Sequence, residues 1–278
     1  MLGAIIGDIV DSVYEWNNIK TKDFPLFSER RFFTDDTVMT IAVADALMNG
    51  GTAENFIDSM KKFGRLYPNS GYGSRFGSWL FSDDRSPYNS WGNGSAMRVS
   101  SCGWFVPLLQ FIREGFYDVD DLAKRSAEVT HNHEEGIKGA QAVAMSIFYM
   151  KHGRMRNDVE QYKEYIRRDI PKLYGYDLSW TLDEIRPGYH FNESCQETVP
   201  EAIIAFLEST DFEDAIRNAI SLGGDSDTLA VITGSIAEAA YGIPKEIANK
   251  ALGYLDAPLH EVYDRWCATL SERNGLPQ

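Results

Sequence analysis

Residues 223–242 read GGDSDTLAVITGSIAEAAYG, and this stretch decides the expected fold. A flexible glycine pair leads into Asp225-Ser226-Asp227-Thr228, and an apolar run with helical periodicity follows from Leu229. Small side chains allow a helix to approach its neighbours closely. Residues of this kind crowd the run at Gly234, Ser235, Ala237, Ala239, Ala240 and Gly242. We therefore expect this segment to form a helix at the centre of the fold.

Helical periodicity also dominates the rest of the chain, with apolar residues at three- and four-residue steps. Such runs cover Val38–Leu47, Phe56–Leu66, Val119–Val129, Ile137–Met150, Val199–Leu207, Phe212–Ile220, Leu229–Ile243 and Glu246–Leu255. Alternating strand patterns are scarce, and neither a βαβ rhythm nor a repeat of fixed period occurs. We predict a single all-α domain over residues 1–278. The irregular, aromatic-rich stretch Pro171–Glu197 is expected to line or cover a site.

The composition limits the kinds of binding partner and the cellular compartment that we expect. With 41 acidic and 27 basic side chains, the formal charge is −14, which disfavours nucleic acid because phosphate binding needs a basic face. Cys102, Cys195 and Cys267 lack pair or metal spacing and are interpreted as reduced thiols of a cytoplasmic protein. The acidic N-terminus does not resemble a signal peptide, and no uncharged apolar run approaches the ~20 residues that span a bilayer. No oligomeric state is predicted.

A second acidic tetrapeptide, Thr34-Asp35-Asp36-Thr37, precedes another apolar helical run. Helix capping explains one such motif taken alone, but capping needs one acid rather than two. Together with Asp225-Ser226-Asp227-Thr228 it supplies four carboxylates and several hydroxyls. Folding could bring these groups together as an oxygen-only cage, which suits Mg²⁺ or Mn²⁺ better than zinc.

A third acidic element lies at the N-terminus, where Asp8, Asp11, Ser12 and Glu15 follow one another at steps of three, one and three. On a helix over Ile5–Trp16 they form one polar stripe. A solvated face is the plain alternative. The remaining faces are strongly apolar, which favours burial. Acids that line an interior cleft need cations, because like charges cannot all stay ionised unaided.

Two further elements suggest contacts with a ligand. The loop Gly92-Asn93-Gly94-Ser95-Ala96-Met97-Arg98 precedes the apolar run Val99–Leu109 and could present backbone N–H groups to an anion, or could simply use glycine at positive φ. His131 and His133 lack a third ligand for zinc. His131 is therefore interpreted as a substrate contact or as a structural residue at a helix junction. No Gly-x-Ser-x-Gly elbow or cysteine nucleophile signature occurs.

With these residues assembled, the chain resembles the ADP-ribosylglycohydrolase family. The matching segments keep the family's order over nearly the whole chain. They are Gly3–Asp8 with Ser12 and Glu15, Thr34–Thr37, Gly92–Arg98, Thr130-His131 and Gly223–Thr228 with its small-residue helix. One position departs from the family pattern, since Asp11 stands where Gly is usual and adds a negative charge near the presumed cage.

The resemblance implies a compact orthogonal helical bundle with two Mg²⁺ or Mn²⁺ ions at its centre. It assigns Thr34, Asp35 and Asp36 as ligands from one side, and Asp225, Asp227 and Thr228 from the other. Glu15 would approach a metal or the distal ribose. Diphosphate and distal ribose would be held by Gly92, Asn93, Gly94, Ser95 and His131. The segment Pro171–Cys195 is our candidate for part of the adenine pocket.

The implied activity is hydrolysis of the glycosidic bond at C1″ of the distal ribose, which releases ADP-ribose from a protein side chain or a small acceptor. Glu15, Asp35 or Asp36 would act on the proton. Two alternatives stay open, a non-enzymatic ADP-ribose binder or structural protein and a metal-dependent phosphoesterase. The sequence does not distinguish arginine, serine, nucleobase or metabolite acceptors.

Overall fold

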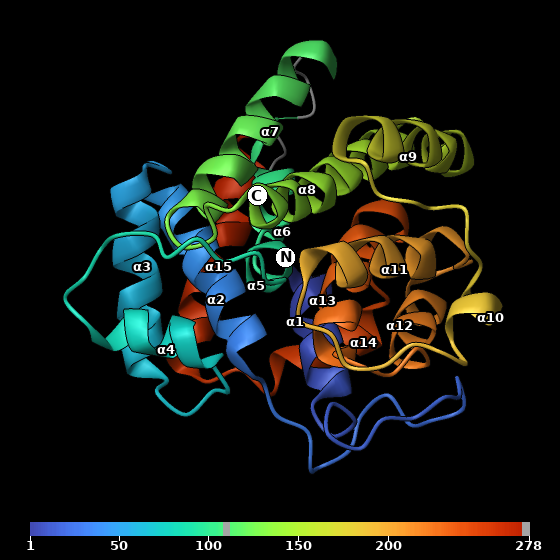
Figure 1. Cartoon of the computed structure of the whole chain (residues 1–278), viewed down its shortest axis with the longest axis horizontal. Coiled ribbons are helices and arrows are strands. Elements are labelled where there is room, and N and C mark those ends of the chain that lie inside the picture. The colour runs from blue at the N-terminus through green and yellow to red at the C-terminus, as the bar shows by residue number, and fades with distance from the viewer. Residues whose placement is uncertain (108–111, 274–278) are drawn as a thin grey trace.

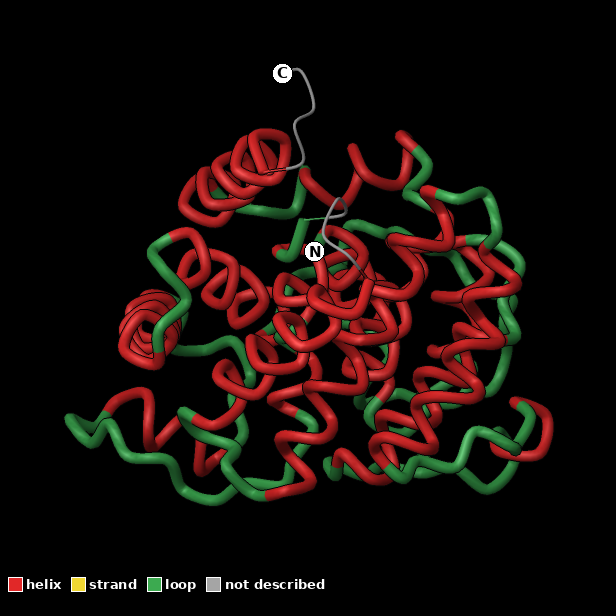
Figure 2. The backbone as a smooth tube through the Cα atoms, turned by 90° about the horizontal axis from the view of Figure 1, so that it is seen from above, coloured by secondary structure: helices red, strands yellow, loops and turns green. Residues whose placement is uncertain are grey.

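The computed structural model describes residues 1–107 and 112–273. In chain order, the helices within these residues are α1 (Leu2–Asp11), α2 (Asp35–Met48), α3 (Ala53–Leu66), α4 (Ser74–Phe81), α5 (Gly94–Met97), α6 (Ser100–Phe105), α7 (Ile112–Glu128), α8 (Glu134–Met155), α9 (Val159–Tyr174), α10 (Leu182–Ile185), α11 (Cys195–Leu207), α12 (Phe212–Ile220), α13 (Ser226–Tyr241), α14 (Lys245–Leu252) and α15 (Ala257–Arg273). Apart from one isolated bridge between Gly92 and Ser194, the described residues contain no β-structure (Figure 2). The predicted all-α fold class is confirmed.

The centre of the fold is the crossing of α1 and α13, which form the most extensive helix pair (Figure 1). Glycine makes this approach possible. A Cβ atom on Gly7 would lie 2.3 Å from the carbonyl oxygen of Ala230, and one on Gly3 would lie 2.1 Å from that of Gly234. The rest of α13 packs against α8, α11 and α12. The small-residue helix is therefore central, as its sequence predicts.

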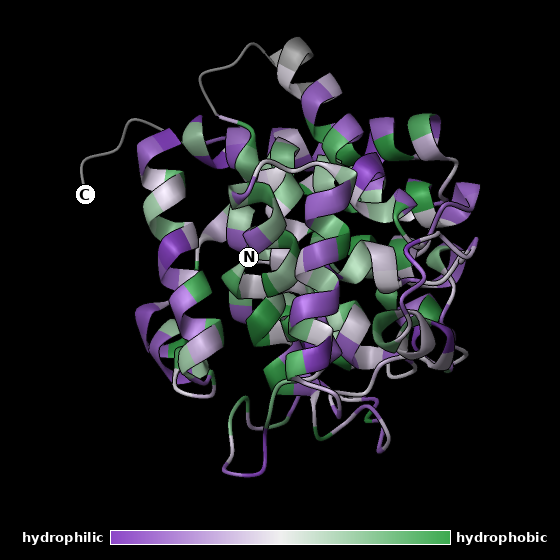
Figure 3. Cartoon of the chain, turned by 90° about the vertical axis from the view of Figure 1, so that its left-hand side faces the viewer, coloured by the Kyte–Doolittle hydropathy of each residue, from purple (hydrophilic) through white to green (hydrophobic). Residues whose placement is uncertain are grey.

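The other helices surround this crossing, with α2, α3 and α4 on one side and α9 to α12 on the other (Figure 1). Hydrophobic residues are concentrated in the interior, while the outward helix faces are largely hydrophilic (Figure 3). Among the described residues, no helix combines the length and apolar character required to cross a membrane.

Three sequence expectations about boundaries need correction. The N-terminal helix ends at Asp11 instead of Trp16, because the Ser12 hydroxyl turns back to the Ile9 carbonyl at 2.9 Å and a series of turns follows. The irregular stretch expected from Pro171 begins only at Gly175, which ends α9 with φ +75°. The run expected over Val99–Leu109 forms α6 in its first part, and residues 108 and 109 lie outside the described residues.

Candidate active site

The two acidic tetrapeptides begin α2 and α13, and their side chains meet at one cavity of about 450 Å³. Ten of the residues singled out from the sequence line this cavity: Glu15, Asp35, Asp36, Gly92, Asn93, Gly94, His131, Asp225, Asp227 and Thr228. Thr34 and Ser95 do not line it. Segments from four distant parts of the chain thus converge on a single concave site, which is the usual arrangement of an active site.

Asp8 fixes the N-terminus of α2 beneath this cavity. Its carboxylate accepts hydrogen bonds from the Thr34 backbone N–H at 2.8 Å and the Thr34 hydroxyl at 2.7 Å. It also accepts from the backbone N–H of Thr37, at 3.1 Å, and from the Thr37 hydroxyl. Asp8 therefore satisfies free donors at the helix start, an anchoring role for which a buried carboxylate is suited.

The Thr34 hydroxyl is engaged by the same anchor. Its proton goes to Asp8, and the oxygen accepts the Asp36 backbone N–H at 3.4 Å as the N-cap of α2. A hydroxyl oxygen has two lone pairs, so one stays available to a cation. The motif therefore caps α2, as it would in isolation, and it also supplies the paired carboxylates.

The carboxylates around the cavity repel one another. Burial and then the charge of Asp227 raise the pKa of Asp35, Asp36 and Asp225 well above the ordinary value. One Asp36 oxygen, Oδ1, is buried without a hydrogen-bond partner. These are the conditions in which buried carboxylates take up a proton or a cation.

Hydrogen bonds position the loop that carries Asp225. The Asn93 amide donates to Asp225 Oδ2 at 2.5 Å and to Thr198 Oγ1 at 3.1 Å. The Asn18 side chain accepts from the Gly224 N–H at 2.8 Å and donates to the Gly224 carbonyl at 3.0 Å. Asn18 also donates to the Glu15 carbonyl at 2.8 Å. One amide side chain therefore ties the Glu15 segment to the loop before α13.

Glu15 is half-buried at the edge of the acidic cluster, beyond the end of α1. Burial, followed by the charges of Asp227 and Asp8, raises the pKa of Glu15 to about 7. A carboxylate in this range can accept and release a proton near neutral pH.

Asp11, the residue that departs from the family pattern, is completely buried and does not line the cavity. Its Oδ2 accepts a hydrogen bond from the Ser226 hydroxyl at 3.0 Å, while Oδ1 has no partner. Burial and the charge of Asp227 raise the pKa of Asp11. The extra carboxylate therefore joins α1 to the start of α13.

The glycine loop and His131 also line the cavity. The Ser95 hydroxyl donates to the Gly136 carbonyl at 2.6 Å, away from the cavity. A Cβ atom on Gly94 would lie 3.2 Å from His131 Nε2, so glycine permits the close approach of the ring. Burial, followed by the charges of Arg98 and Arg75, lowers the pKa of His131 and keeps the ring neutral.

Sequence reasoning missed an aromatic rim. Trp16, Trp91 and Phe191 line the cavity, and the rings of Trp16 and Phe191 stack with centroids 5.8 Å apart. Trp16 is 81% exposed and Phe191 is 41% exposed. Phe191 and Glu193 come from the irregular stretch expected to line a site, so part of that stretch lines this cavity. The tryptophans were missed because single tryptophans in loops carry no readable signal in the sequence. The adenine pocket stays a prediction.

The donor set at the cavity fits a hard divalent cation. All candidate donors are oxygens, Asp36 Oδ1 lacks a partner, and the carboxylates raise each other's pKa. In the described part of the chain, no three His, Cys, Asp or Glu side chains converge as a ready-made cage. The binuclear site is therefore a prediction carried by donor chemistry rather than by coordination geometry.

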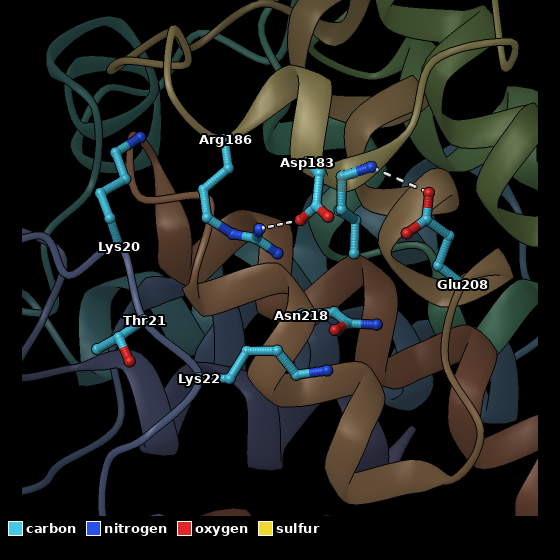
Figure 4. Close-up of a pocket in the computed structure, with 8 residues that line it drawn as sticks. Lys20, Thr21, Lys22, Asp183, Arg186, Glu208 and Asn218 are labelled. Atoms are coloured by element: carbon cyan, nitrogen blue, oxygen red, sulfur yellow. Dashed lines mark hydrogen bonds and ion pairs between the residues drawn. The ribbon is translucent and has the colours of Figure 1, made fainter.

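A second cavity, of about 270 Å³, lies between the segment Lys20–Lys22 and α10 (Figure 4). Its positive side chains already have partners. Arg186 pairs with Asp183 at 2.6 Å, Lys22 pairs with Asp214, and Lys20 donates to the Tyr189 carbonyl at 2.7 Å. The larger acidic cavity is therefore the candidate active site.

Comparison with known proteins gives consistent results. ADP-ribosylhydrolase ARH3 of Xenopus tropicalis is 26% identical over 340 residues, which cover 95% of this chain and 95% of that protein. ADP-ribosylarginine hydrolase Tri1 of Pseudomonas putida is 25% identical over 95% of this chain and 77% of its own length. A solved structure described as an ADP-ribosylglycohydrolase-related protein complex matches with a TM-score of 0.66. At 23% identity over 98% of this chain and 95% of its own, that structure supports the fold alone.

The family model for ADP-ribosylglycohydrolase matches residues 1–275, nearly the whole chain. The matched residues include the central helix crossing and the acidic segments that meet at the cavity. The chain therefore belongs to the ADP-ribosylglycohydrolase family and is an enzyme of that family.

Proposed function

We propose that the protein is a divalent-cation-dependent hydrolase that cleaves the glycosidic bond at C1″ of the distal ribose in an ADP-ribose conjugate. The observation that carries the proposal is the single cavity on which both acidic tetrapeptides, Glu15, the glycine loop and His131 meet. The relatives named ADP-ribosylhydrolase ARH3 and ADP-ribosylarginine hydrolase Tri1 support the substrate class. The substrate would be an ADP-ribosylated protein or a small ADP-ribose conjugate.

Two Mg²⁺ or Mn²⁺ ions would be held from opposite sides of the cavity. Ligands would come from Thr34, Asp35 and Asp36 at the start of α2, and from Asp225, Asp227 and Thr228 at the start of α13. When bound, the ions would supply positive charge that orients the ribose hydroxyls and lowers the pKa of water. The same charge would relieve the repulsion among the carboxylates.

The remaining residues would manage the proton and the substrate. Asp35 and Asp36 belong to the proposed ligand set, which leaves the half-buried Glu15 at the edge of the cavity as the preferred base. Water would form a bond to C1″ as the bond to the acceptor breaks, and the electron pair of that bond would go to the acceptor. The proton taken by Glu15 would then pass to the departing acceptor. The glycine loop and His131 would bind the diphosphate and the distal ribose.

A product assay tests this proposal. The protein is incubated with ADP-ribosyl-arginine, ADP-ribosyl-serine or free ADP-ribose, with Mg²⁺ or with EDTA, and products are identified by mass spectrometry. We expect ADP-ribose to be released from at least one conjugate only with Mg²⁺. AMP plus ribose phosphate would instead indicate a phosphoesterase. Binding of ADP-ribose without turnover of any compound would indicate a non-enzymatic binder.

A further inference from the structure

Arg98 is a buried cation without a carboxylate partner. Its side chain is fully buried at the wall of the active-site cavity. One nitrogen, Nη2, donates to the Thr130 hydroxyl at 2.7 Å and to the Ser126 carbonyl at 3.4 Å, whereas Nε and Nη1 have no partner. Buried arginine is normally paired, because its desolvation is costly. The centroid of the Phe76 ring lies 5.4 Å from the guanidinium carbon, but no carboxylate of the described residues compensates the charge, so the position calls for a functional explanation.

The Thr130 hydroxyl lies between Arg98 and His131. Its oxygen is 2.8 Å from His131 Nδ1. A guanidinium can only donate, so the Thr130 oxygen must accept from Arg98. Thr130 is fully buried, so its own proton needs an acceptor close by, and Nδ1 of His131 lies within hydrogen-bond distance. The Thr130 proton is then directed to Nδ1 of His131.

This direction of donation determines the tautomer of the ring. A neutral imidazole carries one proton, so if Nδ1 accepts, the proton is on Nε2. The ring packs edge-to-face on Tyr88, with centroids 5.9 Å apart. Its Nε2 faces the glycine loop, because Cβ atoms on Gly94 and Gly92 would lie 3.2 and 3.8 Å from it. The ring thus presents one N–H donor at the loop that borders the cavity.

We propose that Arg98 and Thr130 are positioning residues that hold His131 as the Nε2–H tautomer, so that its N–H donates a hydrogen bond to an oxygen of the bound substrate. Only the identity of that oxygen, on ADP-ribose, rests on the proposed function. The tautomer itself depends on the hydrogen bond between Thr130 and Nδ1, which the chain makes without any ligand. An N–H group whose proton is held in place can only donate a hydrogen bond. It therefore favours an anionic or carbonyl-type oxygen over a group that must itself donate.

The tautomer can be measured without any ligand. Nitrogen-15 NMR of the full-length protein, labelled at histidine and kept at pH 7.5, reports whether each ring nitrogen carries a proton. The His131 signal is the one lost in H131Q. We expect an unprotonated Nδ1 and a protonated Nε2. A ring protonated at Nδ1, or at both nitrogens, overturns the proposal.

Two variants of Thr130 test the positioning role. T130V removes the hydroxyl but keeps the side-chain shape. We expect a detectable fraction of the Nδ1–H tautomer and an ADP-ribose affinity, measured calorimetrically with Mg²⁺, that is about fivefold weaker. T130S restores the hydroxyl and should restore both properties. A T130V protein with wild-type tautomer and affinity would contradict the proposal.

A matched control is available in Thr233, a fully buried threonine of α13 whose hydroxyl donates to the Ala202 carbonyl at 2.8 Å away from the cavity. T233V should leave tautomer and affinity unchanged. If T130V does not fold, the wild-type spectrum and T130S decide the question. A wild type that shows the Nε2–H tautomer but does not bind ADP-ribose would overturn the proposed ligand and support the positioning of His131.

Discussion

At the scale of single residues, Asp8 and Asp36 show that buried carboxylates in one cluster have different roles. Asp8 accepts from two backbone N–H groups and two hydroxyls, so its charge is satisfied by the protein. Asp36 leaves Oδ1 without a partner and borders the cavity. The first carboxylate therefore stabilises the fold, and the second is available to a ligand.

Replacing Asp36 should lower turnover, whereas replacing Asp8 should lower stability. We expect D36N to lower turnover at least about a hundredfold with Mg²⁺, because it removes a proposed ligand. Burial and neighbouring charges raise the pKa of Asp36, so in EDTA at neutral pH the variant should melt no lower than wild type. D227N should likewise lose turnover. The measurements are product formation and thermal unfolding.

D8N provides the structural contrast, because the amide replaces one acceptor oxygen with a donor at a site where four donors converge. Hydrogen bonds to charged groups contribute about 1.5–3 kcal/mol, so we expect D8N to lower the free energy of unfolding by at least ~2 kcal/mol in urea titrations. D23N, at an exposed aspartate, is the neutral control. Wild-type turnover in D36N or D227N would remove the metal assignment, and a fully stable D8N would remove the anchoring role.

At the scale of elements, the crossing of α1 and α13 fixes the distance between the acids on those helices. A Cβ atom on Gly7 would meet the carbonyl oxygen of Ala230 at 2.3 Å, and backbone cannot move aside as a flexible side chain can. We expect G7A to lower the free energy of unfolding by about 3 kcal/mol, in the range of overpacked cores. Urea unfolding measures this.

G188A is the control for G7A, since a Cβ atom on Gly188 would have no heavy atom within 4 Å. Turnover should fall in G7A, because Asp8 follows Gly7 directly in the sequence and anchors α2. Equal stability of G7A and G188A would show that the two helices can separate without cost.

Helix prediction from periodicity succeeded where one face is strongly apolar and failed where it is not. The run expected over Leu229–Ile243 corresponds to α13, which ends at Tyr241 and whose residues are buried almost throughout. By contrast, α15 buries only Leu259, Val262 and Trp266, and seven of the sixteen residues of α9 are charged, so neither was expected from the sequence. The end of α1 was misplaced because the local bond from Ser12 to Ile9 competes with helix continuation.

At the scale of the whole molecule, the acidic cluster couples stability to pH. Burial raises the pKa of Asp8 to about 6 and that of Glu15 to about 7, above the ordinary values of 3.8 and 4.5. A carboxyl with a raised pKa in the folded state stabilises the fold below its ordinary pKa, and this contribution is lost as the pH rises through the folded value. Without cations, these two carboxyl groups should therefore make the protein less stable as the pH rises from about 4 to about 7.

Divalent cations should reverse this trend, since they neutralise the carboxylates and bind the folded state alone. Thermal unfolding at pH 5, 6, 7 and 8, in EDTA and in Mg²⁺, measures both effects. We expect the Mg²⁺-induced rise in melting temperature to grow with pH and to shrink in D36N. A rise of the same size at every pH, or in D36N, would indicate non-specific binding.

The sequence by itself determined the helical class, the central small-residue helix and the residues of the acidic constellations, because period and spacing are local properties that survive without the fold. Tertiary structure decided what each acid does. Asp8, Asp11 and Asp36 have the same side chain, but only their neighbours at Thr37, Ser226 and the cavity distinguish the anchor, the strut and the proposed ligand. The hydrogen bonds that link Arg98, Thr130 and His131 were equally invisible in the sequence, since a proton's location depends on contacts that only folding creates.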